Sequence, residues 1–163
     1  MRREYPERPI AAVAAVILHK GKVLLVRRGT PPNKGIWTFP GGCIELGETA
    51  RTACVREVLE ETGIKVNVGP VVETVDVLES DGKRCRRHYT VIDFLAVPAG
   101  DAGPVCASED AEDARWFDMA EIDNCVLVPV ARRVLDRAVL LLDKEPMSIH
   151  QCDNQVEEMR FES

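Results

Sequence analysis

Three glutamates near the middle of the chain, Glu57, Glu60 and Glu61, have the spacing of side chains that share one side of a helix. Like charges three or four residues apart repel by about 0.2–0.5 kcal/mol per pair, and a helix carboxyl end already carries partial negative charge. A divalent cation would reverse this cost, because Mg²⁺ and Mn²⁺ prefer clustered carboxylate oxygens. The spacing therefore predicts a metal site, and a solvated acidic helix face is the alternative.

The acids need a helix and a close neighbouring segment to position them. We expect a helix over residues 49–62 that ends at Gly63 in a left-handed cap. Its apolar side, which should pack on a sheet, carries Val55, Val58 and Leu59. Small side chains one turn back from the acids should admit another segment: Ala50, Ala53 and Cys54. The pair Gly41–Gly42 is the candidate, because glycine backbone approaches a helix without steric penalty.

The remaining pattern predicts strands around this helix. Apolar and β-branched runs, separated by turn signals at His19–Lys22 and Asp81–Gly82, predict strands over residues 12–18, 23–26, 37–39, 66–78, 89–97 and 116–117. A second helical period covers residues 128–142. This order predicts an α/β fold with a mixed sheet between helices, in one domain over residues 1–142. Residues 143–163 form a polar C-terminal tail whose role the pattern leaves open.

Composition excludes several classes of protein. The chain has 163 residues, 45% of them hydrophobic, which suits one domain with a sizeable core. A net charge of -6 disfavours nucleic acid and anionic membrane surfaces as partners, and no apolar run is long enough for a membrane span. Six cysteines without a CxxC pair suggest free thiols in a reducing cytoplasm rather than a zinc ribbon or a disulfide framework.

A longer motif surrounds the glutamates. Gly42 is followed after five residues by Glu48, and after seven more by the run from Arg56 to Ile64, REVLEETGI. This matches every specified position of GX5EX7REUXEEXGU, so the chain resembles the Nudix hydrolase family. The resemblance extends over residues 10–142 through LLVRR, WTFPGG, HYTVIDFL and ARWF.

The resemblance implies a fold, a cofactor and roles for residues. It implies an α/β/α sandwich that hydrolyses nucleoside diphosphates linked to another moiety, with Mg²⁺ as cofactor and Mn²⁺ as a substitute. The metal ligands would be the three glutamates, joined by the carbonyl of Gly41. Glu48 and Arg56 would position the helix. Metal ions in such a site neutralise phosphate oxygens and lower the pKa of the attacking water.

The general base and the phosphate contacts are less determined. In the resembled family a carboxylate from a late loop often deprotonates the water, and here Glu109, Asp110 and Glu112 compete for that role. Glu57 is the alternative candidate for the base. The three loop acids could instead only make the loop soluble, without a catalytic role. For phosphate we expect Arg28 first, then Arg27, together with the backbone of Gly42.

Other residues have ordinary explanations beside functional ones. The cations around Arg84, Arg86 and His88 could bind phosphate, but a solvated hairpin end is favoured. Trp37 and Phe39 could stack a nucleobase, but aromatic residues in a short strand more often belong to the core.

The leading functional prediction is a pyrophosphatase that splits ADP-ribose into AMP and ribose 5-phosphate, because HYTVIDFLA and EDAEDARWF look like that branch of the resembled family. The runner-up is a house-cleaning hydrolase of oxidised or non-standard nucleoside triphosphates, which would use the same motif. A catalytically silent nucleotide-sensing module is the third reading, although such modules typically lose acids that are present here. The expected partner is a small-molecule nucleotide, and homodimerisation, common in the resembled family, stays untested by the sequence.

Overall fold

The computed structural model describes residues 3–29, 33–107, 111–125 and 127–144, and within them the predicted strands and helices are all present. The elements are β1 (Ile10–His19), β2 (Lys22–Arg28), β3 (Trp37–Thr38), β4 (Gly41–Cys43), α1 (Ala50–Thr62), β5 (Val66–Asp81), β6 (Arg84–Pro98), β7 (Ala111–Asp118), the 3-10 turn η1 (Ile122–Asn124) and α2 (Pro129–Lys144). Helix α2 extends two residues into the segment predicted as the tail, and residues 145–163 lie outside the described ones.

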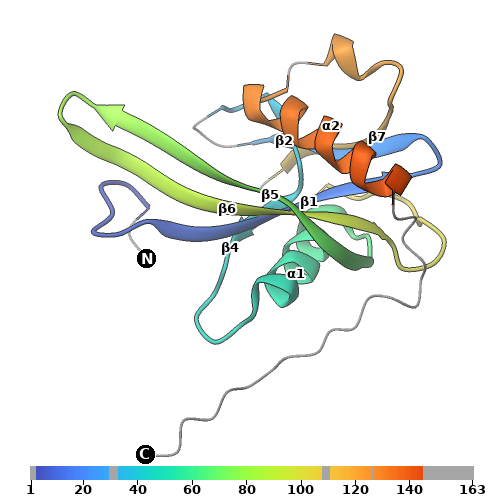
Figure 1. Cartoon of the computed structure of the whole chain (residues 1–163), viewed down its shortest axis with the longest axis horizontal. Helices are drawn as coiled ribbons and strands as arrows, with labels where there is room; N and C mark the ends of the chain where they lie inside the picture. Colours follow the sequence, from blue (N-terminus) through green and yellow to red (C-terminus); the bar gives the residue numbers. More distant parts are fainter. Residues whose placement is uncertain (1–2, 30–32, 108–110, 126, 145–163) are drawn as a thin grey trace, which may run out of the picture.

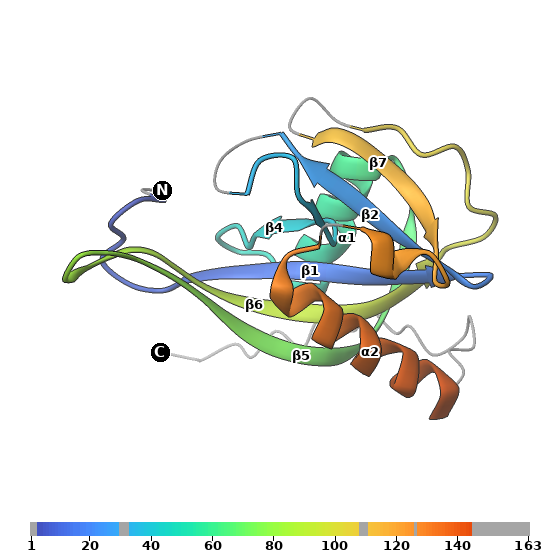
Figure 2. The same cartoon turned by 90° about the horizontal axis from the view of Figure 1, so that it is seen from above.

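The strands form one mixed sheet between two helices. Its main order is β3-β2-β1-β6-β5, while β4 pairs with β1 and β7 pairs with β2. Strands β1 and β6 run parallel, and the other pairs are antiparallel. Helix α1 covers one face of the sheet and α2 the other (Figures 1 and 2). The predicted α/β/α architecture is therefore confirmed.

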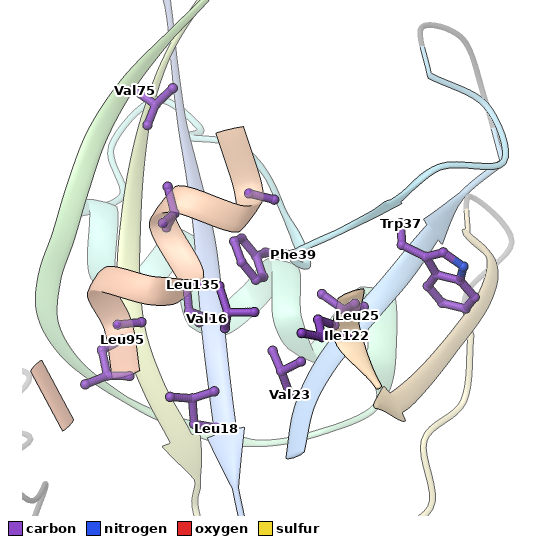
Figure 3. Close-up of a cluster of buried hydrophobic side chains, with 13 residues drawn as sticks. Val16, Leu18, Val23, Leu25, Trp37, Phe39, Val75, Leu95, Ile122 and Leu135 are labelled. Atoms are coloured by element: carbon purple, nitrogen blue, oxygen red, sulfur yellow. The ribbon is translucent and has the colours of Figure 1, made fainter. Parts of the chain in front are cut away.

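Alternating side chains of the central strands supply a separate core to each face. On the α2 face, Val16 and Leu95 pack with Leu135 of α2, as Figure 3 shows. On the α1 face, Ala15 and Phe94 pack with Val58 of α1. Successive side chains of a strand point to opposite faces of the sheet. Alternate residues of β1 and β6 therefore pack towards α1 and towards α2.

Strand β5 is an edge strand and is longer than predicted. With β6 it forms a long hairpin, which Figure 1 shows projecting beyond the two helices. The ladder between these strands has register shifts at Val68/Val71, Val71/Glu73 and Glu79/Ser80. At the first shift, the Arg51 guanidinium of α1 donates to the Val68 and Gly69 carbonyls at 2.8 and 2.9 Å. The side chain of α1 thus satisfies backbone groups that the interrupted ladder leaves unpaired.

Two negative predictions can be examined in the described part of the chain. No helix there is long and apolar enough to cross a membrane. The five cysteines that it contains are free thiols, and Cys152 lies outside it.

Candidate active site

Helix α1 carries the candidate acids and is capped at both ends. The Thr49 hydroxyl accepts a hydrogen bond from the Thr52 amide at 3.2 Å. At the other end Gly63 is left-handed, with φ 71°, and its amide donates to the Leu59 carbonyl at 2.9 Å. These caps satisfy backbone groups that a helix end leaves unpaired. The helix end predicted at Gly63 is confirmed.

The buried stripe of α1 agrees with the prediction at Val58, and Val55 packs partly buried on the same core, but the stripe excludes Leu59. Its members are Ala53, Cys54, Val58 and Thr62. The prediction that Leu59 packs on the sheet was wrong, because this side chain is 42% exposed. Two small side chains of this stripe, Ala53 and Cys54, leave room for the sheet to pack closely. Glu57 and Glu61, one turn after buried residues, consequently lie half-buried at the margin of the stripe, whereas Glu60 is exposed.

The glycine pair on β4 lies against the acids, as predicted. The Gly41 amide donates a hydrogen bond to Glu61 Oε2 at 2.9 Å. A Cβ added to Gly42 would lie 2.4 Å from the Glu57 carboxylate, and one added to Gly41 would lie 2.2 Å from the Val13 carbonyl oxygen. Gly41 therefore requires glycine because of the β1 backbone, whereas a Cβ at Gly42 would displace the end of the Glu57 side chain.

Arg56 is the centre of an ion-pair network between α1 and the segment before it. Its guanidinium donates to both carboxylate oxygens of Glu48, at 2.6 and 3.1 Å, and to the Cys43 carbonyl at 3.1 Å. Its Nη1 lies 2.9 Å from the Glu57 carboxylate and 3.2 Å from that of Glu60. A planar guanidinium suits such a multiple contact. Arg56 therefore offsets part of the repulsion between the acids.

The pKa shifts in this network have identifiable causes. The hydrogen bonds that Arg56 donates lower the pKa of Glu48 below its ordinary value. The same bonds to Glu48, together with that to Glu57, raise the pKa of Arg56. Burial raises the pKa of Glu57, because desolvation outweighs the contact with Arg56, and the charge of Glu60 adds to the rise. Glu57 is consequently a stronger proton acceptor than a solvated glutamate.

The donor set of the acids suits a hard divalent cation. In residues 3–29, 33–107, 111–125 and 127–144, no three His, Cys, Asp or Glu side chains are grouped as ligands of one ion. The contacts explain this, since Glu57 and Glu60 bond to Arg56 whereas Glu61 bonds to Gly41. All three side chains nevertheless offer carboxylate oxygens within two helical turns, the donor type that Mg²⁺ and Mn²⁺ prefer.

The late acidic loop is only partly described. Glu109 and Asp110, two predicted bases, lie outside the described residues. The third, Glu112, belongs to β7 and lies 3.3 Å from Arg27 and 3.5 Å from Lys34. The predicted phosphate ligand Arg27 is thus paired with an acid of the neighbouring strand.

Arg28, the first predicted phosphate ligand, ends strand β2. Its amide donates to the Ile36 carbonyl at 3.1 Å, and its carbonyl accepts from the Gly35 amide at 2.8 Å. Its side chain is partly buried. These backbone bonds fix Arg28 at the base of the turn that leads to β3 and the glycine strand.

The cations at the hairpin end and the two aromatic residues, Trp37 and Phe39, have the structural environments that were favoured over functional ones. At the hairpin end, Arg86 and Arg87 are neutralised by Glu4 and Glu79, which favours a solvated structural cluster over a phosphate site. Trp37 and Phe39 belong to the core on the α2 face, as Figure 3 shows.

One polar residue escaped the sequence analysis. Asp93, in the middle of β6, is only 5% exposed. Burial, together with the charge of Glu73, raises its pKa to about 7. The signal was a single acid inside the apolar run VIDFLAV, residues 91–97.

Comparison with known proteins places this geometry in a family. The family model described as the NUDIX domain matches residues 7–138. An ADP-ribose pyrophosphatase of Methanocaldococcus jannaschii is 37% identical over 111 residues, which cover 68% of this chain and 63% of that protein. A protein of Mycobacterium tuberculosis with the provisional name 8-oxo-dGTP diphosphatase 2 is 30% identical over 142 residues, covering 85% of this chain and 94% of that protein.

A solved structure supports the same architecture. It is a bifunctional NMN adenylyltransferase/ADP ribose pyrophosphatase from Francisella tularensis, complexed with AMP and a Mn ion. The likeness has a TM-score of 0.67 at 22% identity and covers 85% of this chain but 42% of that one. At this identity the likeness concerns the fold alone.

Proposed function

This chain belongs to the Nudix family, and from that membership we propose that it is a metal-dependent pyrophosphohydrolase. Its substrate is a nucleoside diphosphate linked to another moiety, and ADP-ribose, split into AMP and ribose 5-phosphate, is the leading candidate. The observation that carries the proposal is the junction of α1 with β4, where Gly41 donates to Glu61 and Gly42 leaves room for Glu57.

We assign metal binding to the carboxylates of Glu57, Glu60 and Glu61 and to the carbonyl of Gly41. Their hard oxygens suit Mg²⁺, with Mn²⁺ as a substitute. The bound ion would supply charge neutralisation at the phosphate oxygens and a lowered pKa of the attacking water. The protein itself holds the ligands in place, since the Gly41 amide fixes Glu61 while Arg56 contacts the other two acids.

Glu48 and Arg56 are positioning residues in this proposal. Their side chains are 14% and 25% exposed, so their two-point contact is better shielded from solvent than a surface pair. Because Arg56 also bonds to the Cys43 carbonyl, it couples the end of the glycine strand to the acids of α1. Losing this coupling would shift metal ligands and phosphate site relative to each other.

Glu57 is the candidate proton acceptor among the described residues, in molecules where it does not itself ligate the metal. It is half-buried, its pKa is raised, and it lies beside the Gly42 backbone where a phosphate would bind. Glu109 and Asp110, which the family resemblance suggests, stay alternative bases. Glu112 pairs with Arg27 and Lys34, and we assign it the role of holding these cations.

Substrate phosphate would be bound by the backbone of Gly42 and by Arg28, with Arg27 as a further contact. Glycine amides can approach a phosphate closely, and a guanidinium can contact two of its oxygens at once.

The choice of ADP-ribose rests on the name of the archaeal relative and on the two sequence segments quoted above. The mycobacterial relative supports the house-cleaning alternative, in which a nucleoside triphosphate loses pyrophosphate. A panel of ADP-ribose, other nucleoside diphosphate sugars, dinucleoside polyphosphates and oxidised triphosphates, with Mg²⁺, Mn²⁺ or a chelator, separates them. AMP and ribose 5-phosphate from ADP-ribose are the expected products, and pyrophosphate from triphosphates alone would establish the alternative.

A silent nucleotide-sensing module is the remaining alternative. The acids Glu48, Glu57, Glu60 and Glu61 are all present, which argues against it. The double variant Glu57→Gln and Glu61→Gln should abolish turnover of every active substrate. Unchanged turnover in this variant would remove the catalytic assignment. The cytoplasmic location and a homodimer stay part of the proposal, to be tested by fractionation and by sedimentation.

A further inference from the structure

Four residues from four neighbouring strands form one transverse row across the sheet. Ala14 of β1 pairs with Gly41 of β4 on one side and with Asp93 of β6 on the other. Asp93 in turn pairs with Glu73 of β5. Neighbouring strands lie about 4.8 Å apart, so two steps place the Asp93 backbone about 10 Å from that of Gly41. The row connects the glycine strand of the proposed site with the buried Asp93. The distance between them is comparable to the length of one nucleotide.

Asp93 points to the α2 face of the sheet. Leu95, two residues later, packs in the core of that face, whereas the intervening Phe94 packs in the core of the α1 face. Side chains of a strand alternate with a period of two, so Asp93 shares the face of Leu95. Ala14 also packs against the α2-side core and lies beside Asp93 on that face.

Asp93 is deeply buried and has no protein partner among the described residues. Its side chain is 5% exposed, and none of the described residues forms a hydrogen bond or ion pair with it. The nearby cations of α2 are taken by Glu73, which lies 3.1 Å from Arg133 and 3.0 Å from Arg137. A carboxyl that is largely withdrawn from solvent and lacks a protein hydrogen bond would be stabilised by a ligand that donates one.

The sheet face beside Asp93 is incompletely covered. Ala14 and Val91, on the same face, are only partly buried, although Val13 and Ala15 on either side of Ala14 are fully buried. The single methyl group of Ala14 stands between Gly41 and Asp93 in the row. Along this row, the acid is separated from the glycine strand by one methyl group on the α2 face.

We propose that Asp93 is a substrate-recognition residue whose carboxyl accepts a hydrogen bond from the amino group of the nucleobase. The inference rests on the proposed function, because it takes the phosphates to lie at the glycine strand. The carboxyl keeps an acceptor oxygen whether it is protonated or ionised, so it can contact an amino group in either state. Substrates whose base carries an amino group, such as adenine nucleotides, are therefore favoured.

The test compares ADP-ribose with an analogue whose adenine is replaced by unsubstituted purine, which lacks the amino group. For the wild type we expect KM for the analogue to be about tenfold higher, the effect of one hydrogen bond. Asp93→Val should raise KM for ADP-ribose to that of the analogue and change KM more than kcat. Asp93→Asn keeps an acceptor oxygen and should retain most of the preference.

Equal KM values of the wild type for both substrates would overturn the inference, as would full discrimination by Asp93→Val. If the metal-loaded wild type hydrolyses neither substrate, the proposed function fails separately. Calorimetric binding of AMP and of purine riboside 5′-monophosphate to the wild type and to Asp93→Val then decides on Asp93. The wild type should bind AMP more tightly and the variant should bind both equally; equal binding by the wild type, or tighter binding of AMP by the variant, would refute the inference. If Asp93→Val does not fold, Asp93→Ala provides the comparison, with the preference for the amino group expected to be lost and a retained preference refuting the inference.

Discussion

Replacing Gly42 by alanine tests whether the position of the Glu57 carboxylate decides activity. The added Cβ would lie 2.4 Å from this carboxylate, whereas ordinary contacts begin at 3.4 Å. The carboxylate must therefore move by about 1 Å, the difference between these two distances. The atoms that the Cβ would meet are the end of the flexible Glu57 side chain, which can move aside. The variant is therefore expected to fold.

The expected effects on activity and stability differ in size. A misplacement of about 1 Å in a catalytic group costs about 100-fold in rate, equivalent to about 2.7 kcal/mol. Folding loses at most the contact of Glu57 with Arg56, whose side chains are 15% and 25% exposed. One such hydrogen-bonded contact contributes about 1 kcal/mol, and Arg56 keeps its bonds to Glu48.

The assay measures kcat/KM with ADP-ribose and Mg²⁺ alongside thermal unfolding. Gly103→Ala is the matched control, because a Cβ at Gly103 would meet nothing within 4 Å. The control should keep wild-type activity and unfold at the same temperature or slightly above it. In a Glu57→Gln background, Gly42→Ala should have little further effect, since both changes disturb the same group.

Two results would refute this reasoning. One is a folded Gly42→Ala variant with activity within about threefold of the wild type, well short of the loss expected for a 1 Å shift. The other is an equal loss from Gly42→Ala with and without Glu57→Gln, which would place the damage elsewhere.

Further predictions concern the same network and the buried groups. Gly41→Ala should lower the free energy of unfolding by about 1–3 kcal/mol or more, because its Cβ would lie 2.2 Å from a backbone oxygen of β1; an unchanged urea midpoint would contradict this. Arg56→Lys keeps the charge but loses the two-point contact with Glu48, so it should cost about 1–3 kcal/mol in the same experiment, and full stability would count against the network. The pKa of Asp93 is raised from 3.8 to about 7, so the folded state binds its proton more tightly; this stabilisation, at most about 4 kcal/mol, is complete below pH 3.8 and is lost as pH rises through 7. Asp93→Asn should flatten the fall in melting temperature over that range, and identical curves for both proteins would exclude the effect. Burial raises the pKa of Cys54 to about 12, so iodoacetamide at neutral pH should leave it unmodified in the folded protein; mass spectrometry that finds it alkylated at the rate of exposed cysteines would disprove this.

Local patterns predicted the parts of the fold that neighbouring residues determine. Gly63 marked the helix end because a left-handed residue follows from the cap itself, and Asp81–Gly82 marked a hairpin because few sequences make so tight a turn. The glycine pair predicted the close approach to α1 for the same reason, since only glycine leaves the space.

Long-range pairing decided what the sequence analysis missed. The outward rotation of Leu59 depends on how closely the sheet approaches small helix residues, which helical periodicity does not encode. The alignment of Asp93 with Gly41 requires the register of three strands at once. Glu109 and Asp110 stay predictions, because they lie outside the described residues.

The interrupted ladder of β5 has a consequence for how this protein behaves at high concentration. A straight edge of sixteen residues would offer a foreign strand a continuous template for growth into aggregates. The three shifts divide that edge into short pieces, and Arg51 occupies carbonyls at the first of them. An invading strand would find a regular register over at most the seven residues from Glu73 to Glu79, less than half of the edge. The irregularities of β5 thus shorten the template that its open side offers to another strand.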